Sequence, residues 1–232
     1  MSTKYSIIIR NKSDESQQYL IFNDPPKAST NVGKAWSNIW MKTGGTPTPN
    51  GIQNLTIEIE NFAVCGTTPT PLGHGVSVKE SDYASVSLTA ENIQGTAPVM
   101  KIVDGTPAFT QPYSSVDLAN SFGIVTDAFN PDQYRNVYCG YGKYDDTGNV
   151  VPVAVWTAKP SQTYEVTPVV TYYVSTGDFH TGDVVDVTTL GAIAKIDFTT
   201  AKAGQTVATI THEIDGKYSG PVFTYPPTKL RR

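Results

Sequence analysis

The segment from Thr163 to Phe198 constrains the fold more than any other part of the chain. It is rich in Val, Ile, Thr and Tyr, it has no helical periodicity, and it is interrupted by Thr176-Gly-Asp178 and Thr181-Gly-Asp183. Branched and aromatic side chains suit a pleated, half-buried surface, and Gly-Asp pairs are typical of tight turns. The segment therefore predicts consecutive β-strands joined by turns.

The same pattern recurs through most of the 232 residues. The runs Tyr138–Tyr144 and Val150–Trp156 flank a short Gly-containing turn, which predicts a hairpin with a bulge at the glycine. Further strands are predicted at Lys4–Asn11, Tyr19–Phe22, Leu55–Glu60, Val76–Val86 and Pro98–Asp104. Many short strands with few crossover helices indicate an antiparallel sheet architecture.

Two long loops rich in Thr, Pro and Gly, Gly44–Gly51 and Cys65–Gly75, separate these strands. No charged or Gly/Ser-rich linker divides the chain, so residues 1–232 are expected to form a single β-rich domain. We predict an all-β fold, an antiparallel β-sandwich or barrel with long Thr/Pro/Gly loops and at most one or two short helices.

Two segments are harder to assign. Residues 32–42 fit either a helix or an extended segment, because Trp36, Ile39 and Trp40 fall on helical spacing. In the segment 113–134, Ser114 or Ser115 is expected to cap a short helix that continues through Val116, Leu118 and Ala119.

The charge content is low: 16% of residues are charged, the formal net charge is −4 and the isoelectric point is about 5.3. Nucleic-acid binding needs clustered Lys and Arg, so no nucleic-acid partner is expected. The basic residues Lys229, Arg231 and Arg232 are interpreted as a solvated tail. No apolar run approaches the ~18 residues of a transmembrane segment, and no secretory signal is recognised at the N-terminus. An acidic, soluble, cytoplasmic protein is expected.

The chain has two cysteines, Cys65 and Cys139, which are too few for a disulfide scaffold. We interpret them as buried free thiols, and a single disulfide between them is the alternative. They are not arranged in the C-x-x-C spacing of metal or redox sites. Neither a metal nor any other cofactor is predicted.

Few residues carry the chemistry of catalysis. His180 lies near three acidic residues, Asp178, Asp183 and Asp186, which could act with it as a metal site or an acid/base pair. Gly-Asp turns explain the same residues structurally, and we favour that interpretation. The chain lacks a G-x-S-x-G elbow, a Walker loop and a dinucleotide-binding glycine pattern, so the sequence does not decide whether the protein is an enzyme.

Aromatic residues are the more suggestive candidates, because amphipathic rings stack on sugars, bases and lipid headgroups. They also fill the core of a β-sandwich, which is the alternative role. If the chain has a ligand site, we expect it to involve Trp36, Trp40, Tyr138, Tyr141, Asp178 and His180.

The opening run YSIIIRNKS with the following YLIF and PP, the motif AWSNIW, and the late TPVVTYYVSTGDFHTGDVVDV and AKIDF resemble the layout of the RhiA family of rhizosphere-expressed proteins. The resemblance covers the first ~40 residues and the final third of the chain. It rests on framework strands. It implies a soluble, intracellular, β-rich protein in a family without a settled biochemical activity, and it assigns no functional residue.

Three functional interpretations follow. The first is a non-enzymatic β-sandwich that binds a small molecule, glycan or lipid through aromatic loop residues. The second is a metal-independent cyclase or isomerase that holds an apolar substrate in a β-barrel cavity. The third is a structural or storage protein that self-associates, as a homo-oligomer, through open strand edges.

Overall fold

The computed structural model describes residues 4–28 and 32–227. Their elements are almost all β-strands, and the helices among them are two short 3-10 turns, η1 (Val187–Thr189) and η2 (Phe198–Thr200). The predicted all-β class with at most two short helices is therefore confirmed. The basic residues Lys229, Arg231 and Arg232 lie outside the described part of the chain.

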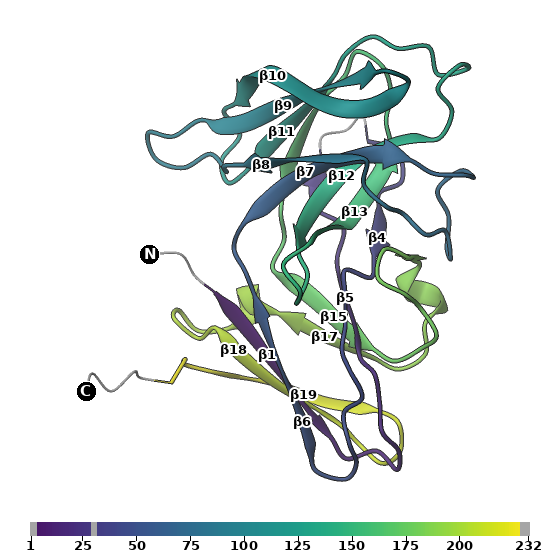
Figure 1. Cartoon of the computed structure of the whole chain (residues 1–232). Coiled ribbons are helices and arrows are strands. Elements are labelled where there is room, and N and C mark those ends of the chain that lie inside the picture. The colour runs from purple at the N-terminus through teal and green to yellow at the C-terminus, as the bar shows by residue number, and fades with distance from the viewer. Residues whose placement is uncertain (1–3, 29–31, 228–232) are drawn as a thin grey trace.

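The lower half of the molecule in Figure 1 contains two four-stranded sheets. Sheet 1 has the order β19 (Tyr218–Thr224), β18 (Val207–His212), β1 (Tyr5–Asn11) and β6 (Gly51–Ile57). Sheet 2 has the order β17 (Ile193–Asp197), β15 (Thr171–Ser175), β2 (Leu20–Asn23) and β5 (Met41–Lys42). Contacts between β17 and β19 join the two sheets into a lower sandwich.

The upper half contains two larger sheets. Sheet 3 has the order β16 (Val184–Val185), β4 (Trp36–Asn38), β13 (Val150–Thr157), β12 (Val137–Tyr144), β7 (Asn61–Thr67) and β8 (Asp82–Val86). Sheet 4 has the order β10 (Thr106–Val116), β9 (Gly95–Val103), β11 (Phe122–Thr126), β14 (Thr163–Thr167) and β3 (Lys27–Ala28). Strand β10 packs on β7 and β8, which joins these sheets into an upper sandwich.

Most strand pairs are antiparallel, and the exceptions among the described strands are β1 with β18 and β9 with β11. One cluster of buried apolar residues extends through both sandwiches, from Ile7 and Ile210 in sheet 1 to Met100 and Ile124 in sheet 4. The chain passes between the sandwiches at several places, for example from β6 to β7 (Figure 1). That the chain forms a single domain remains a prediction.

The hairpin predicted at Tyr138–Tyr144 and Val150–Trp156 is present as β12 and β13. Its register shifts between Tyr141 and Gly142, within the paired strands, whereas the bulge was expected at the glycine of the connecting turn. The ambiguous segment 32–42 is extended and contains β4 and β5. Only Asp82–Val86 of the predicted strand Val76–Val86 is regular.

The short helix predicted after Ser114 or Ser115 is wrong. Ser114, Ser115 and Val116 belong to strand β10 and pair with Ala97, Thr96 and Gly95 of β9. The Ser residues therefore lie inside a ladder whose partner is 17 or more residues away, and long-range pairing of this kind overrides a local capping signal.

The two cysteines face each other directly across β7 and β12, where Cys139 is opposite Cys65. Both are buried and free, as interpreted from the sequence. Burial raises the pKa of both thiols, so neither has the thiolate character that reactive cysteines need. They are core residues.

Candidate functional site

Two loops far apart in the sequence meet on the outer face of sheet 3. Residues 73–80 connect β7 to β8, and residues 176–190 lie between β15 and β17; we call them together the loop face. The Val184 N–H donates to the Val76 carbonyl at 2.9 Å, and the Val78 N–H donates to the Gly182 carbonyl at 2.9 Å. Gly182 has φ +94°, and a Cβ there would lie 2.5 Å from the Val78 carbonyl oxygen. Glycine is therefore required for the loops to come this close.

Asp183 holds the loop face together. One oxygen of its carboxylate accepts a hydrogen bond from the Ser77 hydroxyl, and the other accepts one from the His180 backbone N–H at 2.7 Å. The imidazole Nδ1 of His180 is 3.7 Å from the same oxygen. The Asp183 side chain is only 10% exposed, whereas that of His180 is 80% exposed. The carboxylate is thus used to connect the loops, and His180 projects into solvent.

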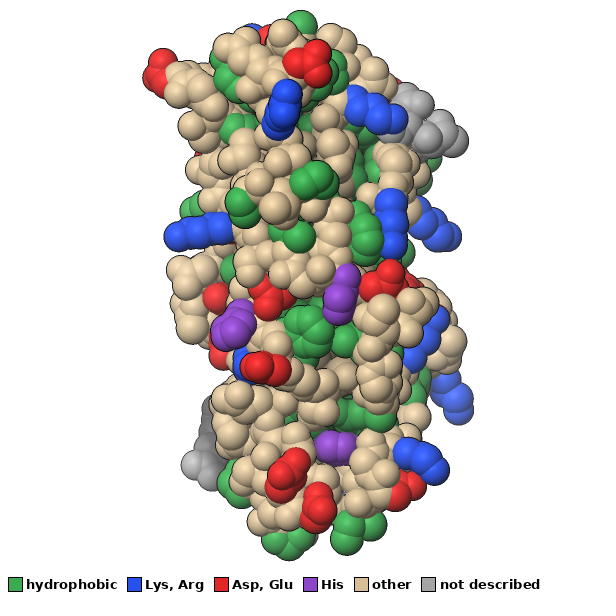
Figure 2. All heavy atoms as spheres, turned by 90° about the vertical axis from the view of Figure 1, so that its right-hand side faces the viewer, with side chains coloured by type: hydrophobic (Ala, Val, Ile, Leu, Met, Phe, Trp, Pro, Cys, Tyr) green, Lys and Arg blue, Asp and Glu red, His purple; other side chains and the backbone are tan. Residues whose placement is uncertain are grey.

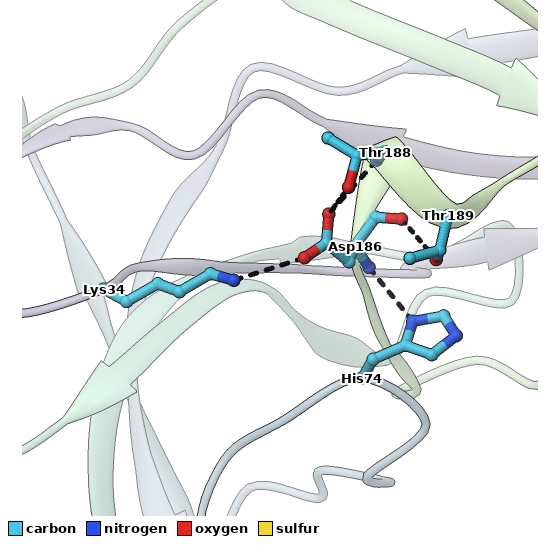
Figure 3. Close-up of polar contacts among 5 residues, drawn as sticks. All are labelled: Lys34, His74, Asp186, Thr188 and Thr189. Atoms are coloured by element: carbon cyan, nitrogen blue, oxygen red, sulfur yellow. Dashed lines mark hydrogen bonds and ion pairs between the residues drawn. The ribbon is translucent and has the colours of Figure 1, made fainter.

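A second polar group is centred on Asp186, at the start of η1 (Figure 3). Its carboxylate accepts hydrogen bonds from the Thr188 hydroxyl and backbone N–H, and Lys34 reaches it at 3.2 Å from the segment before β4. These contacts, those from Thr188 most strongly, lower the pKa of Asp186 to about 2. The Asp186 backbone N–H donates to Nδ1 of His74 at 3.1 Å, so a neutral His74 carries its proton on Nε2.

Figure 2 looks onto this side of the molecule and shows two histidines beside a small hydrophobic patch at about half height, with acidic side chains next to them. The rings of His74 and Phe179 are in edge contact, with centroids 5.5 Å apart. Phe179 is half-buried and covers a small cluster that contains Leu20, Ile39 and Val185. The apolar patch thus continues the core to the surface.

Next to this patch lies an open groove of about 660 Å³. It is formed by residues 77–80 and 181–182 of the loop face, the exposed edge strand β8 and the turn 145–149. The polar and aromatic groups that line it are Ser77, Lys79, Glu80, Tyr83, Asp145, Asn149 and Thr181. Its volume lies within the ~300–1,000 Å³ that is typical of small-molecule sites.

Tyr83 is the exposed aromatic side chain of the groove, with 52% of its surface accessible. Its ring meets the ring of Phe62 edge-on, with centroids 5.7 Å apart, and Phe62 also packs edge-on against Tyr144 at 4.7 Å. Glu80 is half-buried, and this burial raises the pKa of its carboxyl group. The groove therefore offers a ring of fixed orientation beside hydrogen-bonding groups of mixed charge.

Tyr138 lies beneath this surface. It is fully buried in a cluster with Phe62, Val78 and Val184, and its hydroxyl has no hydrogen-bond partner among the described residues. A methyl group at Gly66, directly opposite in register, would lie 2.7 Å from that hydroxyl oxygen. Burial, with a further contribution from Glu80, raises the pKa of Tyr138.

The sequence-predicted site residues separate into two groups. Trp36, Asp178 and His180 lie on or next to the loop face, and the Lys34 ammonium is 3.5 Å from the centroid of the Trp36 ring. Trp40, Tyr138 and Tyr141 have 2% exposure or less. The Trp40 indole N–H donates to Asn23 at 2.6 Å, and the Tyr141 hydroxyl donates to Asn61 at 3.0 Å.

The rings of Trp40 and Tyr138 are therefore buried, whereas the sequence suggested exposed rings on loops. Both belong to the interior: Tyr138 is turned by strand alternation in β12 towards one buried cluster, and Trp40, in the segment between β4 and β5, packs into the main core. Sequence reasoning in turn missed Tyr83, Glu80 and Asn149 of the groove. Only the turn signal Asp145–Asn149 pointed towards that surface.

The sequence pattern of the RhiA family matches residues 2–219. The chain belongs to the RhiA family. No curated protein and no solved structure matches it. In the described ranges, no helix has the length and apolar character to cross a membrane, and no group of three His, Cys, Asp or Glu side chains could hold a metal ion.

Proposed function

We propose that this RhiA-family protein is a non-enzymatic binding protein whose groove beside the loop face takes an uncharged glycan. The observation that carries the proposal is the half-exposed Tyr83, held edge-on by Phe62 next to hydroxyl, carboxyl, amide and ammonium groups. Sugars present an apolar C–H face, which stacks on aromatic rings, and hydroxyl groups that both donate and accept hydrogen bonds.

The composition of the groove favours a glycan over the other ligand classes considered. A lipid chain needs a mainly apolar site, whereas this groove has charged, hydroxyl and amide side chains interspersed among its valines and proline. An anionic ligand needs concentrated positive charge, whereas here Lys79 is accompanied by Glu80 and Asp145. A cytoplasmic location, the lack of a nucleic-acid partner and homo-oligomer formation remain predictions.

The enzymatic alternative has less support from the same region. His180 projects into solvent, and the Asp183 carboxylate beside it is already engaged by Ser77 and the His180 backbone. An acid/base pair for an apolar substrate is expected inside a cavity that excludes water. We therefore assign the pair to loop architecture.

Calorimetric titration with a panel of neutral mono- and oligosaccharides tests the proposal. A sugar that binds wild-type protein should bind Tyr83→Ala about tenfold more weakly or worse, equivalent to about 1.4 kcal/mol. Tyr225→Ala is the matched control, because Tyr225 is 61% exposed and does not line the groove. Equal losses in both variants, or no binding of any sugar to wild type, would contradict the proposal.

A further inference from the structure

A second cavity lies at the waist of the molecule, away from the groove. It has a volume of about 150 Å³ and forms where the connection from β6 to β7 and the connection from β14 to β15 pass between the two sandwiches. Its lining includes three tyrosines, aliphatic side chains and one amine, namely Tyr5, Tyr141, Tyr172, Leu88, Val170 and Lys143, and it is completed on the polar side by Glu58 and Asn61. A cavity of ~150 Å³ is large enough for a molecule the size of benzene.

Lys143 is the unusual member of this set. It lies on β12 two residues after Tyr141 and is only 6% exposed. Its ammonium nitrogen donates to the Glu58 carbonyl at 2.8 Å and to the Glu60 carbonyl at 3.4 Å. An amine buried among tyrosine rings is poorly solvated in its charged form.

Burial shifts the Lys143 amine towards its neutral form. Burial lowers the pKa of Lys143 to about 8, against a smaller opposing effect of Glu60 and Glu58. The Glu58 carboxylate is itself paired with Lys4 at 2.5 Å. A neutral amine has two N–H bonds and one lone pair. The two carbonyls account for the N–H bonds, which leaves the lone pair for a ligand.

We propose that Lys143 captures a small aldehyde or ketone in the waist cavity as a reversible Schiff base. This site is separate from the groove and does not depend on the proposed function. The amine lone pair forms a bond to the carbonyl carbon, and one of the two nitrogen protons passes to the carbonyl oxygen to give a carbinolamine. The remaining nitrogen proton then leaves with the hydroxyl group as water while the C=N bond forms, so that one imine and one water form without an oxidant or reductant.

The cavity suits such a ligand in size and polarity. An aldehyde of a few carbon atoms brings one polar atom, the oxygen, and an apolar chain that matches Leu88 and Val170. The Tyr141 hydroxyl, which donates to Asn61 at 3.0 Å, shows that the wall next to Lys143 also carries a proton-bearing group. A large or strongly charged carbonyl compound does not fit this space.

Reductive labelling of the full-length protein with propanal and cyanoborohydride, followed by peptide mapping, tests the proposal. At pH 7 an amine with a pKa near 8 has a neutral fraction ~100-fold larger than an ordinary lysine. Even with restricted access, we expect Lys143 to be propylated at least about tenfold faster than Lys195, which is 57% exposed.

A cavity-filling variant tests whether the fast labelling of Lys143 depends on access through the waist cavity. Val170→Phe should slow the labelling of Lys143 about tenfold and leave that of Lys195 unchanged, because it closes the cavity and leaves the amine in place. Val222→Phe, at a position 61% exposed, is the control. Labelling of Lys143 no faster than of Lys195 in folded wild type would overturn the proposal, and this comparison stands even if Val170→Phe fails to fold.

Discussion

The two faces of sheet 3 differ sharply, although the same strands build both. The inner face carries large apolar side chains and the two cysteines, and it belongs to the cluster that extends through the whole molecule. The outer face carries a smaller buried cluster, in which Phe62, Tyr138 and Val155 lie beside glycines such as Gly66, and it is covered by loops. Alternation along a strand assigns each residue to one face. The difference teaches that the inner face is part of the main core, while the outer face supports a smaller cluster on which the loops and the groove rest.

The largest expected effect is on the inner face. Trp156 is fully buried in the main core, whereas Trp36 is half-buried at the margin of the outer cluster. We expect Trp156→Ala to lower the free energy of unfolding by about 3–5 kcal/mol, and Trp36→Ala to lower it by about half as much or less. Urea denaturation of both variants measures this. Equal losses would remove the distinction between the two faces.

The next largest expected effect on stability concerns Lys143, whose side chain lies on the same face of β12 as the inward-facing Tyr141. Because its folded pKa is lowered from 10.5 to about 8, the unfolded chain binds more protons between these values, and stability should rise with pH across that window. Relative to Lys143→Met, wild type should gain roughly 3 kcal/mol over the full window.

Urea denaturation at pH 7, 8, 9 and 10 tests this difference. Buried tyrosines with raised pKa values, such as Tyr172, oppose the gain near and above pH 10 in both proteins, so the comparison between the two proteins isolates Lys143. Parallel stability profiles for wild type and Lys143→Met would show that the amine titrates normally.

A smaller effect is expected on the outer face. Gly66→Ala places a methyl group against the Tyr138 ring, which should cost about 1–3 kcal/mol. Tyr138→Phe removes a hydroxyl that is buried without a partner among the described residues, so it should be nearly neutral or stabilising.

The double variant, followed by thermal or urea denaturation, sharpens this test. Removing the hydroxyl should recover part of the loss caused by Gly66→Ala, because the methyl group then meets fewer atoms. Strict additivity of the two changes would mean that Gly66 and Tyr138 do not interact.

Two strands at sheet edges bear on the alternative function, self-association through open strand edges. Strands β10 and β19 lie at sheet edges, where an unpaired ladder could recruit a second chain. Pro107 and Pro112 interrupt β10, and Pro221 interrupts β19. Because proline lacks the N–H that a ladder needs, these strands are poor templates for assembly. Self-association remains a prediction, and size-exclusion chromatography with light scattering measures it.

Local signals predicted the fold where pairing is local. The β12–β13 hairpin follows from two apolar runs around a Gly-containing turn, but its bulge lies within the strands and not at that turn. The helix predicted after Ser114 or Ser115 failed because these residues pair with Ala97 and Thr96 of β9 at the far end of a long hairpin. A local capping signal does not encode that pairing.

The candidate site was less predictable than the fold. His180 and Trp36 were found near the loop face, but a tryptophan or tyrosine in a strand looks the same in the sequence whether it faces the core or the solvent. Lys143 did carry a usable signal, because a lysine two residues after the inward-facing Tyr141 falls on the same face. The groove itself joins residues 77–83 to 145–152 and 181–182, a convergence that only the folded chain creates.

A two-dimensional amide NMR titration with the tightest-binding neutral oligosaccharide tests the central claim most directly. The groove account predicts that shift changes gather in residues 77–83, 145–152 and 181–182, which form the groove, and that they disappear in Tyr83→Ala. Shift changes confined to the waist cavity or to the sheet edges, or a spectrum that does not change with any sugar, would contradict it.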